Sequence, residues 1–253
     1  MTEEIPLVGG YDPANRPVRV GDTVRRRPQP HSDAVRALLL HLEAVGFDGA
    51  PRHLGRDEQG RDVLTYVEGD VPLPPYPPWT FTDDALDSLG HLVRDLHEAT
   101  ATFDQSSASG WSDQWGDPGG GPVICHNDLF PENVVFRDGR VVALIDFDMA
   151  SPGRPAWDLA IAAQEWCPLK APASRVPDAV DLDAVARFGR LARAYGADTT
   201  GLVDVVLESR ARALAHIHEE AAVPGSFWST AWTAEEQATA DADGAWIAAV
   251  VCD

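Results

Sequence analysis

The sequence predicts an α+β protein of two lobes, with a small β-rich N-terminal lobe and a larger, mainly helical C-terminal lobe. Three observations predict this fold class. Short strand-like apolar runs and one helical pattern occupy the first 70 residues, a proline-rich stretch follows, and helical patterns dominate the remainder. The expected divisions are an N-terminal lobe at 1–67, a hinge and proline-rich linker at 68–79, and a C-terminal lobe at 80–253.

The N-terminal lobe is expected to be a small sheet that carries one helix. Five strand-like runs lie at 5–8, 17–20, 23–27, 52–56 and 63–67. Ser32 is the expected N-cap of the helix, since Val35, Leu38 and Leu42 then recur at helical spacing until Gly46. The polar turn between the last two runs predicts a hairpin.

Proline marks the boundary between the lobes. The stretch Gly69–Pro78 contains five prolines and cannot continue a helix or a strand. Thr82 then caps a helix, and a loop rich in Gly, Ser, Asp and Trp covers 106–121. Three strands are expected at 123–125, 134–137 and 141–145, and helices at 157–166, 181–195, 202–222 and in the acidic tail.

Composition limits the partners. The chain has 253 residues, a mass of 27.3 kDa, 44% hydrophobic and 24% charged residues, and a formal net charge of −20. Such a protein is repelled by nucleic acids and anionic membranes, so we expect neither as a partner, whereas a cationic small molecule would be tolerated. The apolar runs are far shorter than a membrane span and the N-terminus shows no secretory signal. We expect a soluble cytoplasmic monomer or homodimer, and three scattered cysteines predict neither disulfides nor a zinc site.

Three oxygen-bearing side chains are expected to converge in the C-terminal lobe. Asp128 and Asn133 share one loop, and a hairpin of the length that returns the chain beside its start then leads to Asp146. Carboxylate and amide oxygens suit Mg²⁺ bound together with phosphate. A further carboxylate nearby can deprotonate a hydroxyl. This is the minimum equipment for phosphoryl transfer, in which positioning and charge neutralisation do most of the catalysis.

The same residues resemble a known family. The pattern H-x-D-x-x-x-x-N at 126–133 matches the catalytic loop of protein kinases, and I-D-F-D at 145–148 takes the place of their metal-binding motif. Together with W-D-L-A at 157–160, the chain resembles the aminoglycoside phosphotransferase family of small-molecule kinases. The resemblance covers nearly the whole chain, is most specific at 124–160, and implies a protein-kinase-like fold.

The resemblance implies roles for the residues of the motifs. Asp128 would be the catalytic base that faces the acceptor hydroxyl. Asn133 and Asp146 would hold Mg²⁺ on the phosphates of ATP, with Asp148 assisting and GTP as an alternative donor. His126 would be structural and brace the loop.

Further roles follow for the nucleotide side. Gly9 and Gly10 would begin a loop that covers the nucleotide, and the backbone of Tyr66 and Val67 would meet adenine at the hinge. Asp158, at a helix start, would bond the backbone of the catalytic loop.

The chain departs from the family pattern at the phosphate-binding lysine. Kinase-like folds use a lysine on the third strand to pair the ATP phosphates. Of 20 basic residues here, the one lysine is Lys170, which lies beyond the predicted metal site. Strand alternation places Arg26 on the same face as Val24, so Arg26 would point at the phosphates instead. No glutamate partner is evident on the next helix, which has Asp33 at its start and Glu43 near its end.

The C-terminal segment gives the one hint about the acceptor. Residues 213–253 contain seven acidic residues and no Lys or Arg. In the family these helices form the acceptor pocket, so an aminoglycoside or amino sugar is the first expectation, and another amino alcohol or natural product is the alternative. The short segment between Asp148 and Trp157 leaves no long activation loop, which disfavours protein substrates. A role in antibiotic resistance and a biosynthetic role both stay open.

Two rival interpretations remain. The missing lysine and glutamate are also compatible with a non-catalytic nucleotide-binding relative. Cys125, next to His126, could suggest a thiol nucleophile, although its place at the end of an apolar strand favours an inert buried thiol.

Overall fold

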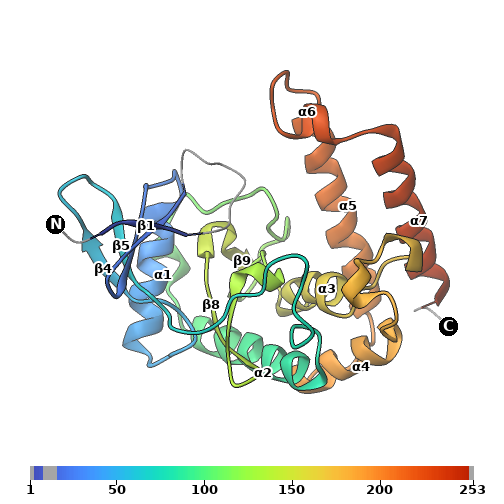
Figure 1. The fold of residues 1–253 in the computed structure, drawn as a ribbon, viewed down its shortest axis with the longest axis horizontal. Helices are drawn as coiled ribbons and strands as arrows, with labels where there is room; N and C mark the ends of the chain where they lie inside the picture. Colours follow the sequence, from blue (N-terminus) through green and yellow to red (C-terminus); the bar gives the residue numbers. More distant parts are fainter. Residues whose placement is uncertain (1–2, 8–15, 251–253) are drawn as a thin grey trace.

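The computed structural model describes residues 3–7 and 16–250. Its N-terminal part is an antiparallel sheet with one helix beside it (Figure 1). In spatial order the strands are β1 (Ile5–Pro6), β2 (Val18–Val20), β3 (Thr23–Arg26), β5 (Asp62–Thr65) and β4 (His53–Arg56), and the helix is α1 (Ser32–Ala44). The predicted hairpin is present, because β4 pairs antiparallel with β5.

One detail of α1 differs from the prediction. The N-cap is His31, and Ser32 is the first helical residue. The Ser32 hydroxyl accepts a hydrogen bond from the backbone amide of Gln29 at 2.7 Å, so it closes the turn before the helix instead of capping the helix itself.

The C-terminal part is mainly helical. Its helices are α2 (Asp83–Thr100), α3 (Pro155–Trp166), α4 (Ala184–Tyr195), α5 (Leu202–Ala221), α6 (Trp228–Ala231) and α7 (Ala234–Val250). Single 3₁₀ turns lie at 105–107, 131–133, 147–149, 172–174 and 177–179. Thr82 caps α2 as predicted, since its hydroxyl accepts from the amide of Ala85 at 3.2 Å. The small N-terminal sheet and helical C-terminal part confirm the predicted fold class.

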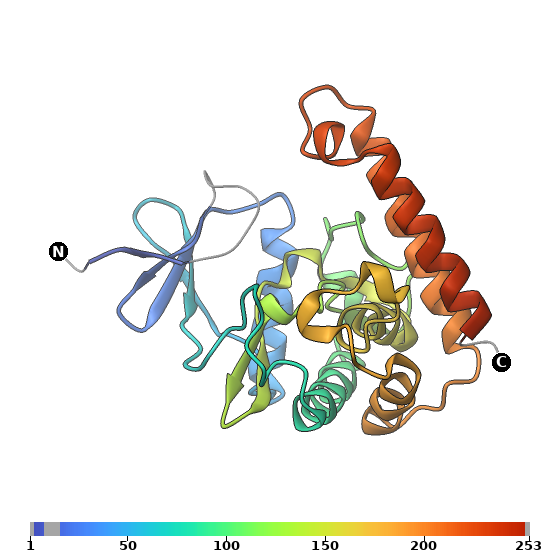
Figure 2. The ribbon, with the colours of Figure 1, turned by 45° about the vertical axis from the view of Figure 1, so that its right-hand side comes forward.

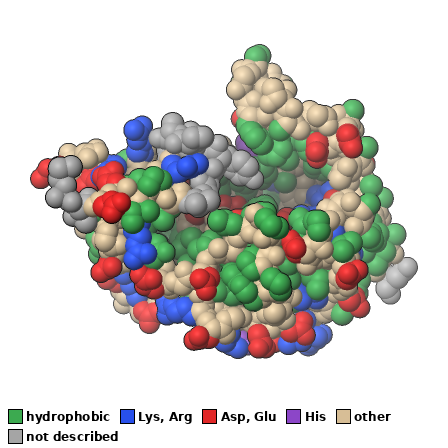
Figure 3. Space-filling view, viewed as in Figure 1, with side chains coloured by type: hydrophobic (Ala, Val, Ile, Leu, Met, Phe, Trp, Pro, Cys, Tyr) green, Lys and Arg blue, Asp and Glu red, His purple; other side chains and the backbone are tan. Residues whose placement is uncertain are grey.

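Helices α5 and α7 lie side by side and rise from the body of the molecule, with α6 near their far end (Figure 2). We call α5, α6 and α7 the arm. Between the arm and the N-terminal lobe the surface is hollowed (Figure 3). The segment that leads from β8 to β9 lies between these two parts in Figure 1. Within the described residues, none of the helices combines the length and apolarity needed to cross a membrane.

Four short strands follow α2 in the chain and form two two-stranded sheets: β6 (Val123–Cys125), β7 (Val134–Arg137), β8 (Arg140–Leu144) and β9 (Ser151–Gly153). β7 and β8 form the predicted hairpin, whereas β9, which pairs with β6, was not expected. Its sequence, Ser-Pro-Gly, lacks the β-branched and aromatic residues that indicate a strand. This pairing brings Cys125, at the entrance of the catalytic loop, opposite Ser151.

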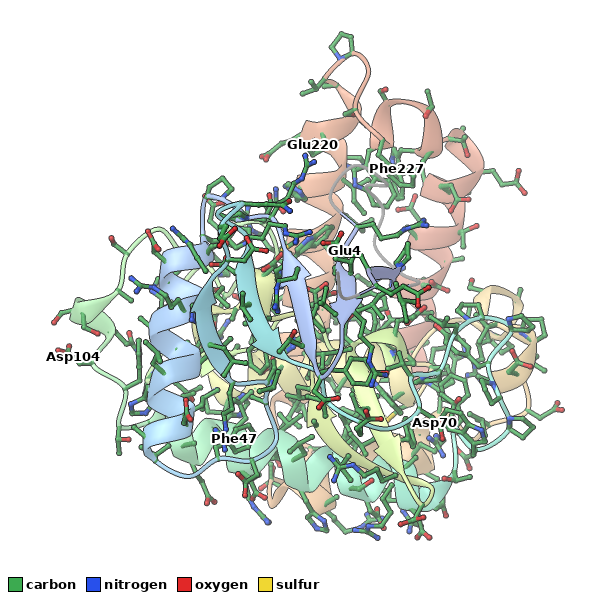
Figure 4. All side chains as sticks on the ribbon, turned by 60° about the vertical axis from the view of Figure 1, so that its left-hand side comes forward. Glu4, Phe47, Asp70, Asp104, Glu220 and Phe227 are labelled. Atoms are coloured by element: carbon green, nitrogen blue, oxygen red, sulfur yellow. The ribbon has the colours of Figure 1, made fainter. Side chains whose placement is uncertain are left out.

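The chain between the lobes is tied to the β7–β8 hairpin. Asp70 and Phe136 exchange two backbone hydrogen bonds, of 3.0 and 2.8 Å, and Asp70 lies beside the hairpin in Figure 4. Gly69 makes this approach possible. Its φ is +143°, and a Cβ atom there would lie 2.3 Å from the carbonyl oxygen of Phe136.

Replacing Gly69 by Ala should therefore destabilise the protein strongly. Gly60→Ala is the matched control, since Gly60 also has a positive φ (+74°) but open space around it. We expect Gly60→Ala to cost about 1 kcal/mol of unfolding free energy from backbone strain, and Gly69→Ala about 2 kcal/mol more because of the added clash. Urea unfolding measures the free energy of unfolding of both variants. Equal losses in the two variants would contradict a steric constraint at Gly69.

Candidate active site

The loop after β6 is fixed by one buried carboxylate. Asp158, in the first turn of α3, is fully buried and accepts hydrogen bonds from the backbone amides of His126 (2.7 Å) and Asn127 (2.8 Å). Asn127 has a φ of +63°, which turns the chain so that both amides face one carboxylate. The Asn127 side-chain amide also donates to the carbonyl of Met149 and the hydroxyl of Ser151, each at 2.8 Å.

A histidine that the sequence did not single out completes this support. His97 Nε2 lies 2.9 Å from Asp158 Oδ2, and His97 Nδ1 lies 2.9 Å from the hydroxyl of Tyr195. Burial alone would raise the pKa of Asp158, but His97 and the two amides hold it below its usual value. The Cys125 sulfur lies within 4.8 Å of His97 and Asp158. His97 and Asp158 bond each other and Cys125 contacts the carbonyl of Arg154, so we assign these three residues a supporting role and not a metal site.

The loop is also held from below by α3. The Trp166 indole donates to the carbonyl of Leu129, in this loop, at 2.8 Å, and the Trp157 indole donates at 3.0 Å to the carbonyl of Trp115, in the separate loop that precedes β6. Both tryptophans are fully buried with their one polar group satisfied, which suits a rigid platform.

Asp128 and Asn133 lie in direct contact. Asn133 Nδ2 donates to Asp128 Oδ2 at 2.6 Å and to the Asp128 carbonyl at 2.9 Å. Burial, together with the nearby Asp146 carboxylate, raises the pKa of Asp128 to about 7. Because the Asn133 nitrogen is used, its amide oxygen is left for another partner.

The hairpin returns Asp146 to this place. The amide of Ile145 donates to the carbonyl of Asn133 at 2.9 Å, so Asp146 follows directly after a residue paired with Asn133. Asp146 has a φ of +63° and a side chain that is 48% exposed, whereas its neighbours on both sides are more covered. The structure thus brings Asp128, Asn133 and Asp146 together, as the spacing predicts; their chemical roles stay predictions.

His126 joins the two halves of the site. Burial lowers the pKa of His126, so the ring is neutral. Its Nε2 donates to the carbonyl of Ile145 at 3.0 Å, and its Nδ1 accepts from the amide of Asp128 at 3.3 Å. The ring also meets the edge of Phe147. These contacts place His126 as a brace, with no free nitrogen for proton transfer.

Arg26 reaches the same site from the N-terminal lobe. Its guanidinium donates to Asp148 Oδ2, and Nη1 lies 3.4 Å from Asp146 Oδ1. His31 Nε2 approaches Asp148 Oδ1 from the other side, at 3.4 Å. Burial by itself would raise the pKa of Asp148, but His31 and Arg26 hold it below its usual value. The preceding arginine, Arg25, donates instead to the hydroxyl of Thr23 and lies 3.7 Å from Asp57, so it does not join the site.

The remaining nucleotide-side predictions fare differently. The backbone amide of Tyr66 donates to the carbonyl of Asp22 at 2.8 Å and so is already used. Of the Tyr66 backbone groups predicted to meet adenine, the carbonyl is the one left for that contact. The guanidinium of Arg19 covers the Tyr66 ring, 3.6 Å from its centroid. Val67 follows in the irregular connection to Gly69 and stays a prediction. Gly9 and Gly10 lie outside the described residues.

The thiol interpretation finds no support. Cys125 is fully buried, its sulfur lies 3.3 Å from the carbonyl of Arg154, and burial raises its pKa well above the usual value. A thiol in this state is not nucleophilic.

Known proteins are similar to this chain in sequence and in fold. The model of a phosphotransferase enzyme family, APH, matches residues 111–181, which span the catalytic loop, the hairpin and α3. The trifolitoxin immunity protein of Rhizobium leguminosarum bv. trifolii is 35% identical over 249 residues, covering 92% of each chain. The chain belongs to the phosphotransferase enzyme family. A homoserine kinase of Brucella anthropi is 28% identical over 160 residues, which cover 61% of this chain and 42% of that kinase.

The fold agrees with this membership. The structure of the GDP and kanamycin complex of APH(2")-IIIa superposes with a TM-score of 0.64 at 16% identity, covering 96% of this chain and 93% of that one. The predicted family and the predicted enzyme class, a small-molecule phosphotransferase with a hydroxyl acceptor, are confirmed.

The raised pKa of Asp128 predicts a pH-dependent stability. Asp128 ordinarily titrates at 3.8, and in the fold at about 7, so folding is favoured at low pH and loses stability as the pH rises from about 4 to 7. Asp128→Asn keeps an acceptor for Asn133 but cannot ionise. Each kcal/mol of unfolding free energy shifts Tm by roughly 2–4 °C in a chain of this size. The Tm of Asp128→Asn should therefore lie several degrees above that of the wild type at pH 8, and the two Tm values should be equal at pH 4.

Asp138→Asn is the control for this measurement, because Asp138 is an exposed carboxylate in the β7–β8 turn. Its melting curve should follow the wild type at every pH. A constant difference between Asp128→Asn and the wild type from pH 4 to 8 would show that Asp128 titrates normally.

Proposed function

We propose that this protein transfers the γ-phosphoryl group of ATP, with Mg²⁺, to a hydroxyl group of a small molecule, with GTP as the alternative donor. The observation that carries the proposal is the meeting of Asp128, Asn133 and Asp146 at the end of the β7–β8 hairpin, with Arg26 reaching them from the opposite lobe. A base, two oxygen ligands and one cation then surround a single point, as in-line phosphoryl transfer requires.

The donor set fits a magnesium ion. Asn133 uses its nitrogen on Asp128, which leaves its oxygen available, and the Asp146 carboxylate is half exposed. Both are hard oxygen donors, with room for phosphate oxygens and water to complete an octahedron. Mg²⁺ held there would neutralise charge on the phosphates and on the leaving ADP.

Asp128 would do the proton transfer. Asn133 fixes one of its carboxylate oxygens at 2.6 Å and so aims the other at the acceptor. As the hydroxyl oxygen bonds to the γ-phosphorus, its proton passes to Asp128, and the bond from the γ-phosphorus to the bridging oxygen breaks with its electron pair leaving on ADP. A pKa near 7 makes Asp128 a stronger base than an exposed aspartate.

For the acceptor we propose an aminoglycoside or a related amino sugar. The support is the acidic C-terminal segment, the net charge of −20, and a structural neighbour solved with kanamycin. The alternative acceptor is another small amino alcohol, and the support for it is the similarity of this chain to homoserine kinases.

A protective role is the second candidate, because the relative that matches over 92% of both chains is a toxin immunity protein. In this role the protein phosphorylates a hydroxyl of a toxic small molecule or peptide and so prevents the toxin from binding its target. The chemistry at Asp128 is the same for both acceptors.

Loss of Asp128 should abolish turnover without abolishing nucleotide binding. A positioned base contributes about 10²–10⁴-fold, so Asp128→Ala should lower kcat by that factor. Coupled detection of ADP release measures kcat, and a thermal shift with Mg²⁺ and ATP measures binding. Asp138→Asn is again the control. An unchanged kcat in Asp128→Ala would contradict the assignment of Asp128 as the catalytic base. If the wild type binds nucleotide but turns over no acceptor, the protein would instead be a non-catalytic nucleotide-binding relative.

The charge of the acceptor should govern its efficiency. Amino sugars and their N-acetylated forms have the same hydroxyls but differ in charge. We expect kcat/KM to be about 10-fold higher or more for the cationic form at low salt, with the gap closing as salt rises, because screening removes the attraction to the acidic protein. Equal values for both forms at low salt would contradict a cationic acceptor and favour a neutral or peptide toxin.

A further inference from the structure

Asp148 is placed unlike a metal ligand. Its Oδ2 is bonded to the guanidinium of Arg26, and its Oδ1 lies 3.4 Å from His31 Nε2, a close contact without the geometry of a hydrogen bond. Its side chain is 20% exposed, against 48% for Asp146. A ligand that must accept a hydrated cation from the cleft is better presented by Asp146, while Asp148 connects β3 to the start of α1.

Helix α1 gives Arg26 no carboxylate. Asp33, in its first turn, pairs instead with Arg56 at 3.2 Å and Arg36 at 3.8 Å. Glu43 lies ten residues further, about 15 Å along the helix axis. Within the described part of the chain, the acidic partners of Arg26 are thus Asp148 and Asp146.

The two partners of Arg26 behave differently once a cation binds. A divalent ion held by Asp146 would repel the guanidinium and compete for the carboxylate, and so would weaken the 3.4 Å contact of Arg26 with Asp146. The bond to Asp148 remains and keeps Arg26 in the cleft. The planar guanidinium has five N–H donors in a fixed fork, so one edge can stay on Asp148 while the other faces phosphate oxygens.

We infer that Asp148 is the positioning residue for Arg26: it aims the guanidinium at the phosphates of the nucleotide, while His31 packs against its second oxygen. It does so in place of the helix glutamate that orients the lysine of protein kinases. This inference rests on the proposed function, and it replaces the assisting metal role that the resemblance implies for Asp148.

Nucleotide binding without metal separates the two roles. A carboxylate beside a polyphosphate repels it, so Coulomb's law alone predicts that Asp148→Asn tightens the binding of ADP in EDTA. If Asp148 aims Arg26, the same change weakens binding by about 10-fold or more, because an oriented charge-assisted contact is lost. Calorimetric titration of the full chain with ADP in EDTA gives the sign directly.

Asp146→Asn is the matched comparison, since it neutralises the neighbouring carboxylate. It should leave ADP binding in EDTA unchanged or tighter and should raise the Mg²⁺ concentration for half-maximal turnover. Asp148→Asn should leave that Mg²⁺ midpoint where the wild type has it. Arg26→Ala should weaken ADP binding as much as Asp148→Asn, and the double variant no further, because the two residues act as one unit.

The inference is overturned if Asp148→Asn tightens ADP binding and raises the Mg²⁺ midpoint, as Asp146→Asn does, or if the effects of Arg26→Ala and Asp148→Asn add. Should Asp148→Asn fail to fold, His31→Ala tests the same point with both charges in place. It should weaken ADP binding in EDTA by a smaller factor, and unchanged binding counts against the inference. A wild-type chain that binds no nucleotide would overturn the proposed function itself.

Discussion

The structure depends on the buried carboxylate of Asp158. A buried charge is costly unless its hydrogen-bonding capacity is filled, and Asp158 fills it with two backbone amides of the catalytic loop and one histidine ring. Through His97 and Tyr195 the same group ties α2 and α4 to the loop. The position of Asp128 is therefore set by the backbone beneath it, and its own carboxylate accepts a hydrogen bond from Asn133 alone among the described residues.

The charges at the site are out of balance. Asp128, Asp146 and Asp148 lie near one another, and the one guanidinium that reaches them in the described part of the chain, that of Arg26, is bonded mainly to Asp148. Burial first, and then the neighbouring negative charge, raise the pKa of Asp128. If Asp146 holds a cation as we propose, metal binding and the strength of the base would be linked, because the cation would remove part of the repulsion that raises the pKa of Asp128.

Sequence spacing could predict the catalytic loop because the hairpin is local: a turn at Asp138 and two short strands must return Asp146 to Asn133. The cap of α2 at Thr82 is equally local. Strand β9 could not be predicted, because its hydrogen bonds come from β6, far back in the chain, and not from any preference of Ser-Pro-Gly for a strand.

Two partnerships lay beyond sequence reasoning for the same reason. Arg26 and Asp148 are 122 positions apart, and nothing in either neighbourhood indicates the other. His97 sits on the buried face of α2, where a single histidine is as compatible with packing as with a role at the site. The roles of these residues can be inferred only once the fold shows which residues they contact. The residues of the loop motif, from His126 to Asp146, instead lie within one short segment of the chain.

The arm lies outside the segment that matches the family model, so it is the part of the molecule where we propose that the acceptor is selected. The family model spans 111–181 and ends before α4, whereas the arm begins at Leu202. The acidic residues of the arm fall into two groups, one buried in hydrogen bonds that hold the arm together and one exposed to solvent. Asp243 is buried between Arg210 and the amide of Ala171 and holds α7 in place, so it cannot attract a ligand. Glu219, Glu235 and Glu236 are exposed and form no ion pair among the described residues, so they are the arm carboxylates best placed to attract the cationic acceptor that we propose.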